Sequence, residues 1–509
     1  MKYIMNIKCP IFHHAEQTPD NRAIITPDQS LTYLQLERIV SQSVTWLEQK
    51  GIQKSTRVAL VGQNSWEYIV LLEAIWRIGA IAVPLNFRFP PGSINDILKK
   101  QEVNYIITGA VNISNFEESC ITIDWTECVK YIHKDKDAPL NDQMNGQKKI
   151  DLNNHAAIIL TSGSTGREKA VLHTYGNYYY NALGSNDNIK LTPGDRWLLS
   201  LPLFHVGGLG ILFRCFIAGA AVVVPQENEK DANEKEALED SLNVYRVTHA
   251  SLVSTQLLRL INHLGEGLVA IRDFSYLKAL LLGGSGFPAA LIRKALSFNL
   301  PIHTSYGLSE MASQVTTTPP GVPADKLFTS GKLLAHRHLI IDKHSEICVK
   351  GETLFKGYVE GSVISRPWGR GGWFHTGDLG RIDADGYLTV LGRQDNMFIS
   401  GGENIMPEEI EGILNELPEI EQVVVVPVIN EMYGFRPAAF LKFRELTEST
   451  AAVPVTKDYL LSYLKERLPH FKIPDYFYYW PKGLAQTSLK VKRSIFLELL
   501  QRKEKPMLL

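Results

Sequence analysis

Short apolar runs alternate with amphipathic, helix-length segments through the first three hundred or so residues, and this alternation constrains the fold more than any other feature. The run RVALVG at 57–62 predicts a buried strand, and the helix after it begins at a capping residue, Ser65, and ends before Gly79. Further strands are predicted at 80–84, 103–109, 156–160, 196–200, 221–224, 249–253, 279–282 and 302–305, and further helices at 31–50, 207–217, 255–264 and 288–298. This alternation predicts an α/β fold with parallel or mixed sheets flanked by helices on both faces.

The pattern changes in the last third of the chain. From about Pro319 the runs become short and rich in glycine, which predicts a small antiparallel β unit. After Arg393 a second compact α/β unit is predicted, with helices at 407–414 and 458–468 and a strand at 423–428. We therefore expect a large N-terminal domain at residues 1–393 and a small C-terminal domain at residues 394–509.

Composition excludes several classes of partner and compartment. Charged residues make up 21% of the 509-residue chain and the net charge is -1, so no electrostatic case exists for binding nucleic acid or an anionic membrane surface. The five cysteines include no C-x-x-C pair, which predicts a reducing, cytoplasmic setting with neither a disulfide framework nor a zinc site. Association with a second copy of the chain stays open.

One segment, 206–225, is apolar enough to suggest a membrane span. Arg214 lies at its centre, where a charge opposes insertion by about 2.5–3.5 kcal/mol. Glycines and an Ala-Val-Val-Val run divide the segment. It is therefore predicted to be a buried helix followed by a core strand.

The strand at 156–160 leads into a glycine-rich loop, TSGSTGREK at 161–169. Glycines allow the backbone to approach an anion, free N–H groups and hydroxyls can donate to phosphate oxygens, and Lys169 adds a positive charge. A Walker loop is excluded because Arg167 follows Gly166 where that loop needs lysine. The sequence GGSGF at 283–287 likewise misses the Gly-x-Ser-x-Gly nucleophile elbow at its last residue. The alternative is an exposed turn without a ligand.

The loop resembles the phosphate loop of the adenylate-forming superfamily, which includes acyl-CoA ligases, luciferases and peptide-synthetase adenylation domains; Glu168 and Ala170 replace the usual Pro and Gly. Other stretches resemble that superfamily in the same order, namely SLPLFHVGG at 200–208, SYGLSE at 305–310, GWFHTGD at 372–378, GRQDNMFISGGENIMPEEIE at 392–411 and LKVKR at 489–493. The resemblance covers nearly the whole chain. It implies that the large domain binds ATP and an acid, and that a mobile C-terminal domain carries a catalytic lysine and serves the CoA half-reaction.

The resemblance also implies a chemistry. A carboxylate is a poor electrophile, whereas an acyl-adenylate has AMP as a leaving group and can be attacked by the thiol of coenzyme A. Catalysis of adenylate formation is mostly positioning and charge stabilisation, supplied by the protein and by Mg²⁺. Lys490 would reach between the carboxylate and the α-phosphate, Glu310 with Thr165 would hold magnesium, and His205 would lie by the acyl pocket. Asp395 would be the hinge between domains.

The residues that the resemblance assigns to the nucleotide come from each of these stretches. Asp378 would bind both ribose hydroxyls and the SYGLSE segment would stack on adenine. The full nucleotide set is Thr161, Ser162, Gly163, Ser164, Thr165, Gly166, Lys169, Gly283, Gly284, Ser285, Tyr306, Gly307, Ser309, Asp378 and Arg393.

Each assignment has a structural alternative. Asp378 could cap a turn, and Glu310 could be a surface residue. Lys490 could be one solvated charge of a basic tail, because Leu489 stands where the superfamily has glycine. His205 could be a structural histidine and Asp395 part of an ordinary polar connection. The shared order of the motifs favours the functional assignments.

Four stretches resemble one branch of the superfamily, the o-succinylbenzoate–CoA ligases of menaquinone synthesis; they are residues 195–214, 248–260, 277–286 and 305–317. Arg214 fits that branch physically, because a cation on an apolar helix needs a negative partner and o-succinylbenzoate has a second carboxylate. A structural ion pair with a core carboxylate is the alternative. The predicted acid-binding residues are His205, Arg214, Ser251 and Thr255. Alternative functions are another aryl or medium-chain acid–CoA ligase, a module that loads a carrier protein, and a non-catalytic binding protein.

Overall fold

The structure is a computed structural model of the chain, and it describes residues 5–109, 120–134, 148–162, 168–225, 238–265, 276–284, 286–444, 455–481, 493–501 and 507–509. The chain divides into two compact units. The first comprises residues 1–284, 300–339 and 349–374, and the second comprises residues 285–299, 340–348 and 375–509. The domain division at 393/394 stays a prediction.

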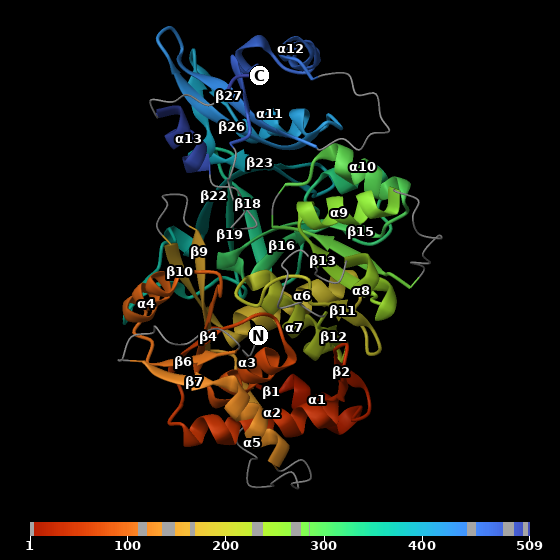
Figure 1. Cartoon of the computed structure of the whole chain (residues 1–509), viewed down its shortest axis with the longest axis vertical. Coiled ribbons are helices and arrows are strands. Elements are labelled where there is room, and N and C mark those ends of the chain that lie inside the picture. Colours follow the sequence, from red (N-terminus) through yellow and green to blue (C-terminus); the bar gives the residue numbers. More distant parts are fainter. Residues whose placement is uncertain are drawn as a thin grey trace. The chain divides into compact units, whose positions relative to one another are not determined.

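A mixed sheet forms one side of the first unit (Figure 1). Its order is β21 (Val363–Ser365), β20 (Gly357–Glu360), β10 (Glu168–Thr174), β9 (His155–Ser162), β5 (Ile81–Leu85), β4 (Arg57–Val61), β6 (Tyr105–Thr108) and β7 (Ile121–Asp124). The strands from β9 to β7 run parallel, whereas β10, β20 and β21 continue the sheet in antiparallel pairs. The predicted strand before the glycine loop is confirmed as β9, and β10 returns beside it.

A second mixed sheet carries most of the segments predicted to bind ligands. Its order is β17 (Lys332–Leu333), β16 (Ser313–Thr317), β15 (Ile302–Leu308), β14 (Ala279–Leu282), β13 (His249–Leu252), β11 (Arg196–Leu198), β12 (Ala221–Val223), β2 (Arg22–Ile25) and β3 (Ser30–Thr32). Strands β15 to β2 are parallel and the two edges are antiparallel. A short pair joins β1 (Asn6–Lys8) to β8 (Lys149–Asp151).

Helices cover these sheets, as the α/β prediction requires. They are α1 (Pro10–Gln17), α2 (Tyr33–Gln49), α3 (Trp66–Ile78), α4 (Pro91–Lys100), α5 (Trp125–Lys134), α6 (Tyr175–Ile189), α7 (Val206–Ala218), α8 (Leu238–Val244) and α9 (Ser254–Gly265). Ser65 caps α3 through the N–H of Tyr68, and Gly79 ends it in the left-handed region, both as predicted. Helices α6 and α7 lie side by side (Figure 1), with Tyr178 stacked on Phe213 at a centroid distance of 5.0 Å.

The apolar segment at 206–225 folds as predicted. Helix α7 ends at Gly219 in the left-handed conformation and β12 follows as a fully buried strand. Across the described ranges of the chain, no helix has both the length and the apolar character that crossing a bilayer requires.

The second unit has its own sheet and core. Its sheet has the order β25 (Glu403–Ile405), β24 (Phe398–Ser400), β27 (Gly434–Phe443) and β26 (Ile420–Asn430), with β28 (Tyr476–Tyr479) parallel to β27. Its helices are α10 (Ala289–Ser297), α11 (Pro407–Leu414), α12 (Lys457–Lys465) and α13 (Arg493–Gln501). The predicted helices at 407–414 and 458–468 and the strand at 423–428 are thus confirmed.

The glycine-rich region after Pro319 forms short antiparallel strands, as predicted. A small sheet has the order β18 (Arg337–Ile341), β19 (Glu346–Gly351), β22 (Phe374–Ile382) and β23 (Leu388–Arg393). Strands β20 and β21 depart from the predicted separate unit, because β20 pairs with β10 and extends the sheet of the first unit.

Candidate functional site

Several predicted segments follow the carboxyl ends of neighbouring parallel strands. The strands β11, β13, β14 and β15 are adjacent, and the segments after them begin near residues 199, 253, 283 and 309. Ligands of open α/β sheets bind at the carboxyl ends of strands, so residues far apart in sequence meet at one edge. Direct contacts join the segments there: Ser200 Oγ donates to the Ser251 carbonyl, and Ser305 Oγ donates to the Leu282 carbonyl at 2.8 Å.

Three of the glycines predicted to bind the nucleotide, Gly283, Gly284 and Gly307, lie at this edge. Gly283 follows β14, and Gly284 has a φ of +84°, which favours glycine. Gly307 lies in β15, where an added Cβ would collide with the Ser313 carbonyl of β16. Tyr306, the residue before Gly307 in β15, is buried. Because the glycines have no Cβ, another group can come close to the backbone at this end of the sheet.

Glu310 is held by a residue that the sequence did not identify. It lies in a short 3₁₀ turn at 309–311 directly after β15, and Tyr358 Oη donates to Glu310 Oε1 at 2.7 Å. Tyr358 belongs to β20, which pairs with β10, and the ammonium of Lys169 on β10 lies 4.9 Å from the centroid of the Tyr358 ring. Lys169 from the predicted phosphate loop and Glu310, predicted to hold magnesium, therefore flank one tyrosine. A single carboxylate with a cation beside it suits a Mg²⁺ held mainly by phosphate oxygens.

A buried histidine, His173, holds the backbone of Ser309. His173 Nε2 donates to the Ser309 carbonyl at 2.7 Å, and Tyr178 Oη donates to His173 Nδ1 at 3.2 Å. Burial lowers the pKa of His173 to about 4, so the ring is neutral and the two contacts define its tautomer. The turn that carries Glu310 is thus anchored to β10 and α6.

Part of the predicted phosphate loop is described. Thr161 pairs with Lys169 across β9 and β10, and Thr161 Oγ1 donates to the Lys169 carbonyl at 3.3 Å. The backbone of Ser162 ends β9. Six predicted residues lie outside the described residues: Gly163, Ser164, Thr165, Gly166, Ser285 and Lys490.

Arg214 is a buried cation that pairs with no carboxylate among the residues that the structure describes. Arg214 lies on α7, and only 1% of its surface is exposed. Its guanidinium lies 4.9 Å from the centroid of the Trp197 ring, and Nη2 is 3.5 Å from Ser313 Oγ. Within the described part of the chain, Nε and Nη1 have no hydrogen-bond partner. Burial lowers the pKa of Arg214 to about 10, which leaves it charged at neutral pH.

A second buried arginine increases the positive potential around Arg214. Arg337 donates to the carbonyls of Gln314, Ala335 and Asn181, so backbone oxygens satisfy its guanidinium. Burial, with the nearby Arg214, lowers the pKa of Arg337 to about 9. Two charged guanidiniums buried near each other favour an anion at this position.

Trp197 contacts both Ser251 and Arg214. The Trp197 indole N–H donates to Ser251 Oγ at 3.2 Å, and the same ring faces the Arg214 guanidinium. His205 is the residue before α7 and lies half-buried beside Phe204, and Thr255 lies in the first turn of α9. Trp197 was missed as a site residue, although its stretch, DRWLLS, contributed to the resemblance.

In the second unit, Arg393 joins the two predicted acidic residues. Asp378 and Arg393 are cross-strand partners in β22 and β23. Arg393 Nη1 donates to Asp378 Oδ1 at 3.1 Å, and Nη2 donates to Asp395 Oδ2 at 3.2 Å. Burial alone would lower the pKa of Arg393, but Asp378 and Asp395 outweigh burial and raise it. The predicted ribose ligand and the predicted hinge residue are thus tied to one guanidinium.

The chain belongs to the AMP-binding enzyme family. The family's main domain matches residues 11–359 and its C-terminal domain matches residues 409–489. The 2-succinylbenzoate–CoA ligase of Bacillus licheniformis is 32% identical over 490 residues, which cover 94% of this chain and 97% of the relative.

Solved structures agree with this relationship. The o-succinylbenzoate CoA synthetase of Bacillus subtilis in complex with the acyl-adenylate intermediate OSB-AMP superposes with a TM-score of 0.83 at 29% identity, covering 99% of this chain and 100% of that one. The same Bacillus subtilis protein in complex with ATP and magnesium ion gives a TM-score of 0.80 at 29% identity, covering 93% and 96%.

Proposed function

We propose that the chain is an ATP-dependent 2-succinylbenzoate–CoA ligase that produces succinylbenzoyl-CoA, AMP and pyrophosphate for menaquinone synthesis. ATP and coenzyme A are substrates, and Mg²⁺ is the cofactor. The observation that carries the proposal is Arg214, a fully buried guanidinium on α7, two of whose nitrogens have no hydrogen-bond partner among the described residues.

The charge argument selects the class of acid. Leaving a cation buried and unpaired costs several kcal/mol, so a fold retains it where a ligand supplies the counter-charge. A fatty acid has a single carboxylate, which the reaction consumes, and would leave Arg214 unpaired. A dicarboxylic acid keeps one carboxylate for Arg214 while the other reacts.

In the first half-reaction, a carboxylate oxygen of the acid bonds to the α-phosphorus of ATP, and the bond to the leaving pyrophosphate breaks. Magnesium, when bound, neutralises charge on the phosphate oxygens. Glu310, oriented by Tyr358, offers the metal an oxygen ligand, and Lys169 offers the phosphates a cation. Asp378 positions the ribose, and Lys490 stabilises charge between the carboxylate and the α-phosphate.

In the second half-reaction, the sulfur of coenzyme A bonds to the acyl carbon and AMP leaves with the electron pair of the broken C–O bond. The thiol proton passes to solvent. We assign the rearrangement between the two steps to a hinge at Asp395, with the C-terminal domain beginning at residue 394. The Arg393–Asp395 ion pair at 3.2 Å is a contact that this rearrangement would alter.

A reducing compartment supports a cytoplasmic location. None of the five cysteines, at positions 9, 120, 128, 215 and 348, forms a disulfide.

The test is acid-dependent exchange of labelled pyrophosphate into ATP. We expect exchange with o-succinylbenzoate and none with benzoate, coumarate or octanoate. Exchange with one of the monocarboxylic acids instead would retain adenylate formation and refute the substrate. Absence of exchange with every acid, in folded protein that binds ATP, would refute the enzyme class.

A further inference from the structure

We propose that Asp342, Glu346, Cys348 and His375 form a binding site for a transition-metal dication of the zinc type. These residues belong to the second unit, whereas Glu310, predicted to bind magnesium, belongs to the first. The proposal departs from the prediction, made from the cysteine spacing, that the chain has no zinc site. The site would hold the turn between β18 and β19 against strand β22.

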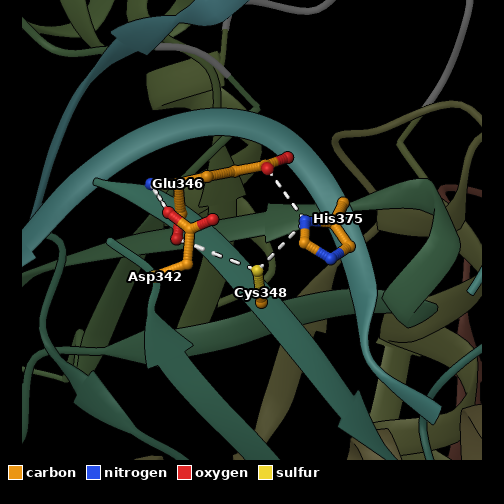
Figure 2. A group of neighbouring side chains, drawn as sticks. All are labelled: Asp342, Glu346, Cys348 and His375. Atoms are coloured by element: carbon orange, nitrogen blue, oxygen red, sulfur yellow. Dashed lines mark hydrogen bonds and ion pairs between the residues drawn. The ribbon is translucent and has the colours of Figure 1, made fainter. Parts of the chain in front are cut away.

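The four side chains come from different parts of a small sheet (Figure 2). Asp342 follows β18, Glu346 and Cys348 lie in β19, and His375 lies in β22. One potential ligand atom from each residue lies within 4.8 Å of all the others. In Figure 2 the His375 ring faces both the Cys348 sulfur and the Glu346 carboxylate.

Two of the separations, both from His375, are close to those between ligands of one tetrahedral ion. His375 Nδ1 is 3.4 Å from Cys348 Sγ and 2.8 Å from Glu346 Oε2. With zinc–sulfur bonds near 2.3 Å and zinc–nitrogen or zinc–oxygen bonds near 2.0–2.1 Å, tetrahedral angles place such ligands about 3.6 Å and about 3.4 Å apart. Sulfur and nitrogen are therefore almost in position, and the carboxylate has to move by about half an ångström.

Backbone N–H groups already orient both carboxylates. Asp342 Oδ1 accepts from the N–H groups of His344 and Glu346, each at 2.8 Å. Glu346 Oε1 accepts from the Gly377 N–H at 2.8 Å. Each carboxylate thus has one oxygen fixed to the backbone, which is how supporting hydrogen bonds orient metal ligands. The second oxygen of Glu346 contacts His375 Nδ1, and a bound ion would replace that contact.

The donor set selects the class of metal. Sulfur and imidazole nitrogen favour zinc and similar transition metals, whereas magnesium and calcium require oxygen ligands. Cys348 is buried, while the His375 side chain is 51% exposed and gives an ion access from solvent. The thiol proton passes to solvent as the sulfur–metal bond forms.

The position of the site suggests a structural role. His375 precedes Asp378 by three residues in β22, and the Glu346–Gly377 hydrogen bond links the turn to the same strand. An ion bound by all four residues would cross-link the segments at 342–348 and 375–378. The alternative is a metal-free hydrogen-bonded cluster, in which His375 pairs with Glu346 alone.

Cobalt(II) tests the proposal directly. We expect one equivalent, added to the full chain after dialysis against a chelator, to produce a thiolate-to-cobalt charge-transfer band, and zinc but not magnesium to abolish the band. Cys348→Ser should remove the band, and His375→Ala should weaken cobalt binding by about tenfold or more. The half-exposed position of His375 makes the second variant compatible with folding.

Cys120→Ser is the matched control, because Cys120 is a partly buried cysteine of the first unit that forms no disulfide. It should leave the band unchanged. Absence of a band in the parent protein, a band that survives Cys348→Ser, or displacement of cobalt by magnesium would each overturn the proposal.

Discussion

Two buried arginines, Arg77 and Arg214, differ in their partners. The difference distinguishes a structural charge from one that we propose to bind the substrate. Arg77 on α3 makes a bidentate pair with Glu37 on α2, with N–O distances of 2.8 and 2.7 Å. Both side chains are 2% exposed. Arg214 is as deeply buried but faces an aromatic ring and a serine.

The pKa values of the two guanidiniums shift in opposite directions. Burial alone would lower the pKa of Arg77, yet Cys9 and Glu37 outweigh burial and raise it. For Arg214 burial dominates and the pKa falls to about 10. Among the described residues, the fold completes the ion pair of Arg77 but gives Arg214 no carboxylate, so we expect an external anion to supply the counter-charge. The following experiments would sharpen or break this contrast.

The largest effect is expected for Arg77→Met. The substitution leaves Glu37 buried without its counter-charge, so the free energy of unfolding should fall by about 3–5 kcal/mol. Denaturant unfolding with the same probe as for the parent protein measures this loss. A change below about 1 kcal/mol would show that the pair is not a structural element.

Arg214→Met should show the reverse pattern. Stability should be unchanged or higher, because the substitution removes an unpaired buried cation. The KM for o-succinylbenzoate should rise by about 10- to 100-fold, the equivalent of losing a hydrogen bond to a charged group, while the KM for ATP is unchanged. An equal rise for both substrates, or a stability loss as large as that of Arg77→Met, would refute the carboxylate role.

The surroundings of Arg77 also predict a pH dependence. Burial raises the pKa of Glu73 to about 8, against the lowering effect of Arg77. Between about pH 4.5 and pH 8 the folded chain keeps this proton and the unfolded chain loses it. The free energy of unfolding should therefore fall as pH rises through this window, by at most about 1.4 kcal/mol per pH unit.

Thermal unfolding between pH 5 and pH 9 measures this slope. Glu73→Gln should flatten it, whereas Glu67→Gln, a less buried position on the same helix, should not. A slope unchanged by Glu73→Gln would assign the dependence to other groups.

The secondary structure that the sequence predicted rests on strong local signals. Helix α3 has a serine cap and a glycine stop, and the parallel strands are short apolar runs between helices. Helix α6 was missed because its inner face carries buried polar residues. One of them, Asn181, donates to the carbonyls of Met311 and Gln314, so tertiary hydrogen bonds replace the apolar periodicity that a sequence reveals.

The same limit applies to the site. Arg214 was predicted because a charge within an apolar helix is visible in the sequence. Tyr358 and His173 support the Glu310 turn only through strand pairing and side-chain contacts across long sequence separations. Cys348 and His375 are likewise 27 residues apart, a spacing that no metal-binding pattern predicts.

The smallest effect is expected for Tyr358→Phe. This substitution tests a carboxylate, Glu310, in the same way that the preceding ones test buried arginines. Glu37 is held by a charged partner, whereas Glu310 accepts from the neutral Tyr358 hydroxyl at 2.7 Å. Removing that hydroxyl should lower kcat for pyrophosphate exchange by about fivefold, the equivalent of about 1 kcal/mol, and leave the KM for the acid unchanged.

Tyr68→Phe removes a buried hydrogen bond to the Leu60 carbonyl and is the matched control. It should lower the free energy of unfolding by about 1 kcal/mol with no change in exchange. If both variants lose stability and neither loses activity, Tyr358 is a packing residue and the orientation of Glu310 depends on its backbone alone.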